Sequence, residues 1–277
     1  MNEPDVSVII PTYRREREVV EAIRSALSQE GILLEVLVLD DTPEGTATNA
    51  VISLGDPRVR YVKRAVTSQG KPALVRNEAM EQARGRYLYF LDDDDHVLPG
   101  ALRALASGLE AKPSAAVAYG TVQPFGQDSQ IVARYSEWFG WAAHVSRFLA
   151  HSSWLAVGTI LFRGTLIINS VCMMRRECAL ALGGYDATIP VYEDVEFHMR
   201  GMRRWGHVFV DHPVLHYRTG APSLIHNLNG NQEPIQRSYK IIHRKYKETY
   251  GLADYRALQI ASKLLPLRVP MIKKSSL

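Results

Sequence analysis

The chain has 277 residues, of which 46% are apolar and 22% charged, so it can form an ordinary globular core and its composition argues against disorder. Its only cysteines, Cys172 and Cys178, are too few for a disulfide framework and make a poor zinc site without a nearby histidine pair. We therefore expect reduced thiols in a cytoplasmic protein. We expect no signal peptide, and no apolar run approaches the roughly 20 residues of a membrane span.

The formal net charge of +4 is distributed unevenly along the sequence. Residues 235–277 contain ten Lys or Arg and two acids, a net charge of +8, so the first 234 residues carry −4. A mildly acidic main body argues against a nucleic-acid-binding core. The basic tail leaves two interpretations open: terminal helices that pack on the domain, or peripheral contact with an anionic membrane surface.

Short apolar runs alternate with single helical patterns over the first 120 residues. Strands are expected at 6–11, 34–39, 59–62, 87–91 and 115–120. Helices are expected around 19–27, 46–54, 73–83 and 99–111. This alternation is typical of βαβ units, so we predict an α/β fold with a doubly wound, mixed but mainly parallel sheet flanked by helices.

The second half of the chain has a less regular pattern. Further strands are expected at 166–174, 207–210 and 214–218. Further helices are expected at 137–149, just before Gly183-Gly184, from Glu193 onward, and at 234–250 and 253–265. Aromatic residues crowd positions 121–165 without a clean period. They either pack in the core or form an acceptor-binding wall, because aromatic rings stack on sugars.

Four consecutive carboxylates, Asp92–Asp95, directly follow the apolar strand 87–91. Open α/β sheets bind ligands at the carboxyl ends of their strands, and a hard divalent cation offsets the repulsion between adjacent acids. In an extended chain the first and third acids point to one side and the second to the other. The alternative is a solvated acidic loop. Because Asp40-Asp41 also ends a strand, we expect both acid sets to face one crevice.

Several motifs occur in the order and at the approximate intervals of a known family. They are 6–13 (Val-Ser-Val-Ile-Ile-Pro-Thr-Tyr), Asp40-Asp41, 76–79 (Arg-Asn-Glu-Ala), 85–95, and 183–186 followed by Glu193-Asp194. Together they resemble the inverting family 2 glycosyltransferases, over residues 6 to about 218. The resemblance implies a GT-A fold with a nucleotide-binding half, a DXD metal motif, and an acceptor half that carries the catalytic base.

The same resemblance implies a role for each motif. The donor-binding residues would be Pro11, Thr12, Tyr13, Asp41, Arg76, Asp92 and Asp93. The ligands of a Mg²⁺ or Mn²⁺ ion would be Asp94 and Asp92, with Asp95 as a supporting acid. Asp194, next to Glu193, would be the catalytic base. For Arg76 the alternative is a charge on the surface of a helix.

One departure from the family concerns the segment Tyr217-Arg218-Thr219-Gly220, where many relatives carry a histidine after Tyr-Arg, near the metal. His216 and His226 are the candidates that replace it, and the alternative for both is a structural polar role.

The implied activity is inverting transfer of a hexosyl-type unit from a nucleoside diphosphate sugar to an acceptor hydroxyl or amine. UDP is the expected nucleotide because it is the commonest in the family. The acceptor would be a growing polysaccharide, a lipid-linked sugar or a small molecule. A metal cluster in one half and a single carboxylate in the other suit transfer better than hydrolysis, which pairs two carboxyl groups across one bond.

The alternative function is a non-catalytic membrane-surface scaffold, or a nucleotide-sugar-binding protein, that uses the basic C-terminal helices. We expect a GT-A domain at 1–234, divided into a donor half (1–112) and an acceptor half (113–234), and a basic helical extension at 235–277. The expected location is the cytoplasm, with peripheral contact at the inner face of the membrane left open.

Overall fold

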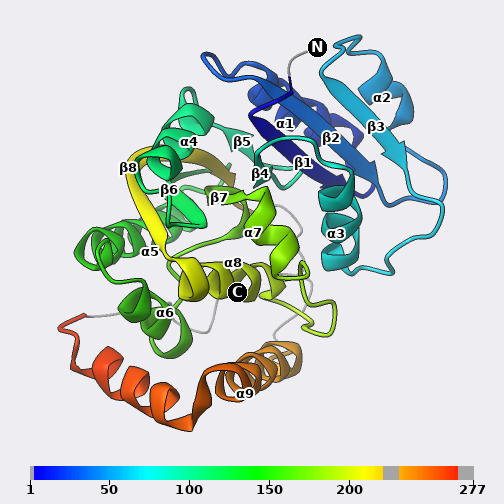
Figure 1. Cartoon of the computed structure of the whole chain (residues 1–277). Coiled ribbons are helices and arrows are strands. Elements are labelled where there is room, and N and C mark those ends of the chain that lie inside the picture. The colour runs from blue at the N-terminus through cyan, green and yellow to red at the C-terminus, as the bar shows by residue number, and fades with distance from the viewer. Residues whose placement is uncertain (1–2, 221–230, 268–277) are drawn as a thin grey trace.

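The computed structural model describes residues 3–220 and 231–267, and its centre is one eight-stranded sheet of order β3-β2-β1-β4-β7-β6-β8-β5 (Figure 1). The strands are β1 (Val6–Thr12), β2 (Leu34–Asp40), β3 (Val59–Lys63), β4 (Tyr87–Phe90), β5 (His96–Val97), β6 (Val117–Phe125), β7 (Cys172–Arg175) and β8 (His207–Arg218). The helices are α1 (Glu16–Leu27), α2 (Thr48–Ile52), α3 (Pro72–Gln82), α4 (Ala101–Ala111), α5 (Ser129–Leu149), α6 (Ser153–Phe162), α7 (Arg176–Ala181), α8 (Glu193–Trp205) and α9 (Glu233–Leu264), with a 3₁₀ turn η1 (Asn169–Val171).

The N-terminal half confirms the predicted βαβ arrangement. Strands β3, β2, β1 and β4 are parallel neighbours, and β1 pairs with β2 from Val6↔Leu34 to Thr12↔Asp40. The apolar runs of β1, β2 and β4 are buried because helices cover both faces of this half. The carboxyl ends of these strands therefore lie along one edge, where the chain carries Asp40-Asp41 and Asp92–Asp95.

The sheet becomes mixed beyond β4. Strand β7 is antiparallel to both β4 and β6, β8 is parallel to β6, and the short β5 is antiparallel to β8. The predicted strand 166–174 is largely wrong, because only its last three residues belong to β7 and a 3₁₀ turn precedes them. Asn169 and Ser170 in that turn are buried polar residues that bond to the acid segment instead of continuing the sheet.

Residues 121–165 hold more helix than the aromatic crowding suggested. Helix α5 begins eight residues before the predicted start, where the Asp128 side chain caps it by accepting hydrogen bonds from the backbone of Gln130 and Ile131. Helix α6 was not predicted. Phe139 is buried, and Trp141 and Trp154 pack partly buried against the core: Trp138 contacts Trp141 at 5.1 Å between ring centroids, and Trp154 donates to Asp254 at 3.0 Å. These contacts favour the core interpretation for Phe139, Trp141 and Trp154, whereas Phe148 is 58% exposed.

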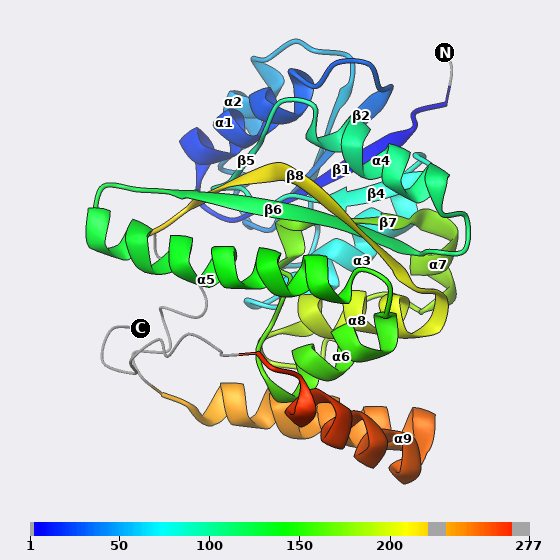
Figure 2. The same cartoon turned by 90° about the vertical axis from the view of Figure 1, so that its left-hand side faces the viewer.

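Helix α9 forms the outermost layer, against α6 and α8 (Figure 2). It turns sharply at Gly251, whose φ of 84° lies in the left-handed region, so the two predicted helices are confirmed as two segments of one element. Leu258 is fully buried and lies against Gly158 of α6. Among residues 3–220 and 231–267, no helix is long and apolar enough to cross a membrane. The division of the chain at residue 234 stays a prediction.

Candidate active site

The acid segment leaves the sheet immediately after β4. The backbone N–H of Asp92 donates to Ser170 Oγ at 3.0 Å, and Asp95 N–H donates to the Asp92 carbonyl at 3.1 Å, which closes a turn. The expectation of an extended segment is therefore wrong. The four acids do not act as one group: Asp93 and Asp94 converge on Arg15, Asp92 bonds to Arg76, and Asp95 bonds to the backbone of Arg218.

The second and third acids share one arginine from the start of α1. Arg15 Nη1 donates to Asp93 at 2.8 Å and to Asp94 at 2.7 Å, and Thr12 Oγ1 donates to Asp93 at 2.8 Å. Burial raises the pKa of Asp93 to about 6, although Arg15 and Thr12 act in the opposite direction. Burial also raises the pKa of Asp94, and the negative charge of Asp92 adds to the effect. Both acids therefore favour added positive charge at this position.

The fourth acid, Asp95, binds the backbone at the end of β8. Asp95 is almost completely buried and accepts a hydrogen bond from the backbone N–H of Arg218 at 2.9 Å. The Arg218 guanidinium donates to the Asp94 carbonyl at 2.8 Å and to Glu21 at 2.8 Å. Asp95 therefore supports the site by holding the end of β8 against the acid segment. Arg218 is a site residue that the sequence did not reveal.

A buried arginine joins the two halves of the site. Arg76 of α3 donates from Nη2 to Asp92 at 2.9 Å and from Nη1 to Glu193 at 2.8 Å. Its side chain is only 8% exposed, so the interpretation as a surface charge is wrong. Asp92 and Glu193 are 101 positions apart in sequence, and this bridge places the acid segment and the start of α8 at one site.

The electrostatics of the Glu193-Asp194 pair follow from burial beside this arginine. Burial raises the pKa of Glu193 to about 7, while the positive charge of Arg76 opposes the shift. Burial also raises the pKa of Asp194; Arg76 lowers it and the negative charge of Asp92 raises it. Asp194 therefore lies within electrostatic reach of both Asp92 and Arg76, at the N-terminus of a helix, where a carboxylate is stabilised.

Asn77 holds the loop that leads into α8. Its amide donates to the Tyr185 carbonyl at 2.9 Å and accepts from the Tyr185 N–H at 2.7 Å. Gly184, with φ of 77°, has no room for a side chain because a Cβ would collide with the Asn77 amide. The Tyr185 ring packs edge-on against Phe90 of β4 and stacks on Phe197 of α8 at 4.1 Å. This cluster fixes α8 relative to the acid segment.

The two acids at the end of β2 have different surroundings. Asp40 is fully buried and accepts hydrogen bonds from the backbone of Thr42 and Ala47, both at 2.9 Å, which makes it a structural residue. Asp41 lies beside Thr12, because its N–H donates to the Thr12 carbonyl at 2.9 Å, and its carboxylate is held by Arg64 and Ser68.

The predicted donor-binding residues of β1 also lie at this edge. Pro11 is partly buried, Thr12 bonds to Asp93, and the Tyr13 ring is 51% exposed with the Arg14 guanidinium over it at 5.3 Å. The structure thus gathers the first-strand residues, Asp41 and the acid segment along one edge of the sheet.

A metal ion fits this site only with ligands from outside the protein. Within the described ranges, no group of three or more His, Cys, Asp or Glu residues is arranged to hold one. Asp92 and Asp94 nevertheless repel each other and offer the carboxylate oxygens that Mg²⁺ prefers. Mg²⁺ is commonly bound by one or two carboxylates together with substrate phosphates, so this pair fits a cation that a diphosphate completes.

The structure does not bring His216 into the acid segment as a metal ligand. Its ring stacks on Phe125 at 3.9 Å and lies near His96 at 6.1 Å, and burial together with nearby His96 and Arg218 lowers its pKa. We therefore leave His216 out of the proposed metal site. His226, the other candidate, lies outside the described residues.

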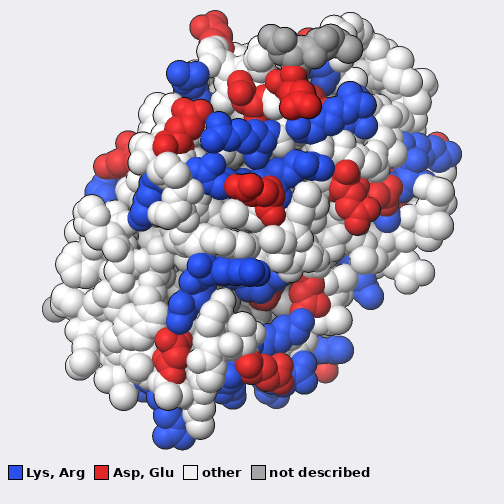
Figure 3. All heavy atoms as spheres, in the orientation of Figure 1, with Lys and Arg blue, Asp and Glu red and all other residues white. Residues whose placement is uncertain are grey.

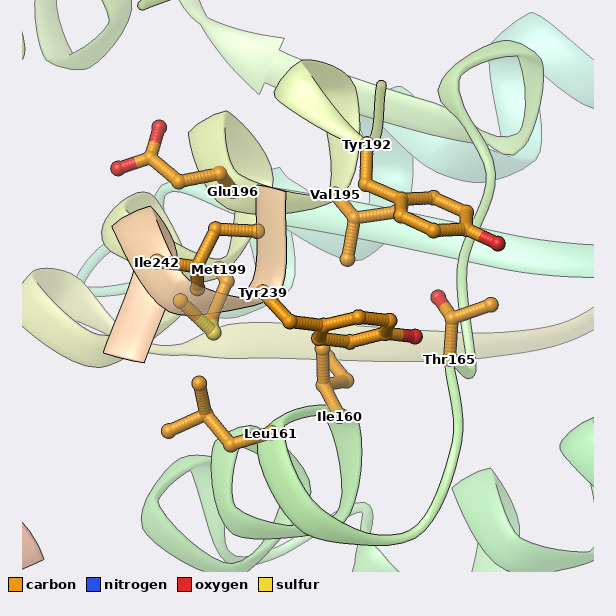
Figure 4. A pocket seen from close by; sticks show the side chains of 9 residues that line it. All are labelled: Ile160, Leu161, Thr165, Tyr192, Val195, Glu196, Met199, Tyr239 and Ile242. Atoms are coloured by element: carbon orange, nitrogen blue, oxygen red, sulfur yellow. The ribbon is translucent and has the colours of Figure 1, made fainter. Parts of the chain in front are cut away.

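A small apolar pocket lies between α6, α8 and α9 (Figure 4). Two of its lining residues, Tyr192 and Val195, flank Glu193-Asp194 in the sequence. Figure 4 shows the Tyr192 and Tyr239 rings side by side, with both hydroxyls directed to the same side of the pocket as Thr165. The free volume of about 20 Å³ holds little more than one water molecule, so the pocket cannot take a sugar ring. It instead shows that α9 contributes an aromatic side chain next to the start of α8.

On the molecular face of Figure 3, Lys and Arg side chains lie next to Asp and Glu over most of the charged area. The left side of this face, where α5 and α6 lie in Figure 1, is largely uncharged. The charges of this face therefore do not form a field of one sign.

Comparison with known proteins gives both a sequence and a structural match. The family model described as "Glycosyl transferase family 2" matches residues 7–171. The succinoglycan biosynthesis protein ExoO of Rhizobium meliloti is 34% identical over 134 residues, which are 48% of this chain and 38% of that protein. The GalNAc(5)-diNAcBac-PP-undecaprenol beta-1,3-glucosyltransferase of Campylobacter jejuni is 38% identical over 104 residues, 37% of this chain and 33% of that protein.

Two solved structures share the fold. S. aureus TarS 1–349 in complex with UDP-GlcNAc has a TM-score of 0.68 and 16% identity, covering 94% of this chain and 71% of that one. The mannosyltransferase PcManGT from Pyrobaculum calidifontis, in complex with GDP-Man and Mn²⁺, has a TM-score of 0.56 and 16% identity, covering 95% and 76%. These likenesses confirm the predicted α/β GT-A architecture. Because the family model matches more than half of the sequence, the chain belongs to glycosyl transferase family 2.

Proposed function

We propose that this chain transfers a glycosyl unit from a nucleoside diphosphate sugar, with a UDP-sugar as the first candidate, to an acceptor hydroxyl or amine with inversion. The observation that carries the proposal is the Arg76 bridge, in which one guanidinium donates to both Asp92 and Glu193, the residue next to Asp194. Family membership supports it, as do the two structural neighbours, which are complexes with UDP-GlcNAc and GDP-Man.

The donor would bind along the edge formed by β1, β2 and the acid segment. Tyr13 offers an exposed ring for the base, and Asp41, whose buried carboxylate is held by Arg64 and Ser68, would fix the adjoining edge of the base site. Mg²⁺ or Mn²⁺ held by Asp92 and Asp94 would offset the negative charge that develops on the departing diphosphate. Arg15 and Arg76 already place positive charge at this point, so the protein's own side chains contribute to the same stabilisation.

Asp194 would accept the proton of the acceptor hydroxyl or amine as the new glycosidic bond forms. A base must be deprotonated before the reaction, and burial works against this because it raises the pKa of Asp194. The positive charge of Arg76 acts in the opposite direction and favours the carboxylate. Arg76 would therefore have two roles, holding Asp92 near the donor and keeping Asp194 ionised.

The acceptor would approach from the side of α8 and α9. Tyr192 lies next to Glu193 and close to the Tyr239 ring at 5.6 Å, and Tyr239 is 39% exposed, so an acceptor sugar would stack on its outer side and not in the small pocket between the two rings. The relatives named for succinoglycan biosynthesis and for an undecaprenol-linked glycan favour a growing polysaccharide or a lipid-linked sugar as the acceptor class.

The test is donor turnover with Mn²⁺ in the absence of added acceptor, measured as release of nucleoside diphosphate when water takes the sugar. A panel of UDP-, GDP- and dTDP-sugars identifies the donor. Asp94→Ala is expected to abolish metal-dependent turnover while the folded state is retained. Asp211→Asn is the matched control, because Asp211 is a surface acid paired with Arg147. Equal turnover in Asp94→Ala would contradict the proposal, and a chain that neither binds nor turns over any donor in the presence of Mn²⁺ would favour a scaffold.

A further inference from the structure

The second segment of α9, residues 252–264, has an inner face that packs on the domain. Leu258 and Ser262 are fully buried. Asp254 accepts hydrogen bonds from Trp154 of α6 and Arg203 of α8, each at 3.0 Å, and from Tyr246 at 2.7 Å. The inner face is therefore fixed to the domain, and the only acid of this segment is used there.

The outer face of the same segment is apolar and basic. Leu252, Ile260 and Leu264 are 54%, 60% and 78% exposed, and Arg256 and Lys263 are exposed as well. Positions 252, 256, 260 and 264 are spaced by four residues, so they follow one side of the helix. Ala253 and Ala257 are also exposed. No other described helix exposes three large aliphatic side chains.

We propose that this outer face binds to the surface of an anionic lipid bilayer, with the helix lying in the plane of the interface. Apolar side chains of such a helix enter the boundary between head groups and acyl chains, while Lys and Arg meet lipid phosphates. The charge pattern supports this partner, because the sequence from Tyr255 to Leu277 contains five Lys or Arg and no acid.

A second copy of this chain fits the same face less well. A symmetric dimer places the same patch on both sides of the contact, so Arg256 and Lys263 would face like charges without an acid to pair with. A bilayer that contains phosphatidylglycerol supplies the missing negative charge. The inference does not depend on glycosyl transfer, because it uses no residue of the candidate active site.

The experiment is flotation of the full chain with vesicles of phosphatidylcholine alone and of phosphatidylcholine mixed with phosphatidylglycerol. The native chain is expected to float with the mixed vesicles and to dissociate as salt is raised. The double variant Ile260→Ser/Leu264→Ser is expected to bind at least about tenfold more weakly, from the transfer energy of one aliphatic side chain. Arg256→Gln/Lys263→Gln is expected to lose about fivefold per cation.

Matched controls use exposed aliphatic residues of the N-terminal half. Leu33 and Val66 are 52% and 75% exposed, so Leu33→Ser/Val66→Ser removes comparable apolar surface elsewhere and is expected to float like the native chain. Circular dichroism checks that the α9 variants remain folded. Equal flotation of native and Ile260→Ser/Leu264→Ser chains, or an equal loss in the control, would overturn the inference. The inference would also be overturned if light scattering showed that the native chain is a dimer and that Ile260→Ser/Leu264→Ser is a monomer.

The outcome is separable from that of the proposed function. Asp94→Ala is expected to float as the native chain does, because Asp94 lies in the acid segment after β4 and not on α9. If the α9 variants lose flotation while their donor turnover is unchanged, the result supports the membrane-binding face of α9 independently of the proposed function.

Discussion

The Arg76 bridge makes a prediction that depends on pH. The change is Arg76→Met, which keeps most of the side-chain volume and removes the guanidinium. In the native protein this group donates to Glu193 at 2.8 Å and to Asp92 at 2.9 Å. Its removal leaves Glu193, whose side chain is 9% exposed, without a compensating charge. Both the stability of the fold and the ionisation of the site are therefore expected to change.

The magnitude follows from burial and from the pKa of Glu193. Removing one partner of a buried ion pair costs about 3–5 kcal/mol. The Asp92 side contributes less than a buried pair because that side chain is 41% exposed, so we expect about 3 kcal/mol at a pH near 8.5. Because the folded-state pKa of Glu193 is raised from 4.5 to about 7, its neutral form is favoured in the fold. The stability linked to this group is complete below pH 4.5 and is lost as the pH rises through about 7.

Arg76→Met should therefore lower the free energy of unfolding most at a pH at which Glu193 is charged. Without Arg76 the pKa of Glu193 rises further, and at a pH near 5.5 the neutral acid needs no partner, so the expected cost falls to about 1 kcal/mol. Urea unfolding of native and Arg76→Met chains at both pH values measures the difference. Arg17→Met is the control, because the Arg17 side chain is 86% exposed and its ion pair within residues 3–220 and 231–267 is with the half-buried Glu21, at 3.3 Å. Equal costs at both pH values, or no cost, would refute the reasoning.

Three other predictions concern the loop that leads into α8, the buried histidine His207 at the start of β8, and the pH dependence of turnover. In Gly184→Ala the new methyl would collide with the Asn77 amide, and the backbone would be strained at its φ of 77°, so we expect the free energy of unfolding to fall by at least about 2 kcal/mol. In Gly31→Ala the φ of 69° is also unfavourable but the space around it is open, so the expected fall is only about 1 kcal/mol. Chemical denaturation of both variants compares the two values. His207 has a pKa lowered by burial from 6.5 to about 4, so the stability linked to its neutral form is present above pH 6.5 and lost as the pH falls through 4. His207→Gln should reduce this acid destabilisation by up to about 3 kcal/mol in unfolding curves measured along the pH range, and an unchanged pH dependence would contradict it. As the pH is lowered, turnover should fall with a midpoint above the usual pKa of aspartate, because burial raises the pKa of Asp194. In Arg76→Lys this midpoint should move to higher pH, because the shorter side chain stabilises the Asp194 carboxylate less. A midpoint at or below pH 3.8 would argue against Asp194 as the base.

The sequence predicted the N-terminal half well because its signals are local. Unbroken apolar strands followed by acids, as in Tyr87–Phe90 and Asp92–Asp95, require a buried sheet with polar groups at one edge, and that is the observed arrangement. The family resemblance also predicted which distant motifs share the site. Arg76 and Glu193 are joined by one hydrogen bond, although no periodicity in the sequence relates them.

The remaining features depend on tertiary contacts that no local pattern specifies. A 3₁₀ turn stands at Asn169–Val171 where a strand was predicted, and its Ser170 hydroxyl accepts a hydrogen bond from the distant backbone N–H of Asp92. The roles of Arg15 and Arg218 depend on side chains that reach across the sheet edge. An Arg next to a motif strand is a weak signal in sequence, since most such residues lie on the surface. Asn77 was visible within a motif, but its contact with Tyr185 became clear only in the structure.

The most direct test of the central claim is nucleotide binding measured by calorimetry with and without Mn²⁺, on native, Asp94→Asn and Asp194→Asn chains. The account predicts that Mn²⁺ strengthens binding of the preferred nucleoside diphosphate to the native chain and to Asp194→Asn, and that Asp94→Asn loses this metal dependence. Asp194→Asn should bind normally and yet fail to transfer. Binding that ignores Mn²⁺ in all three chains, or normal transfer by Asp194→Asn, would contradict the account.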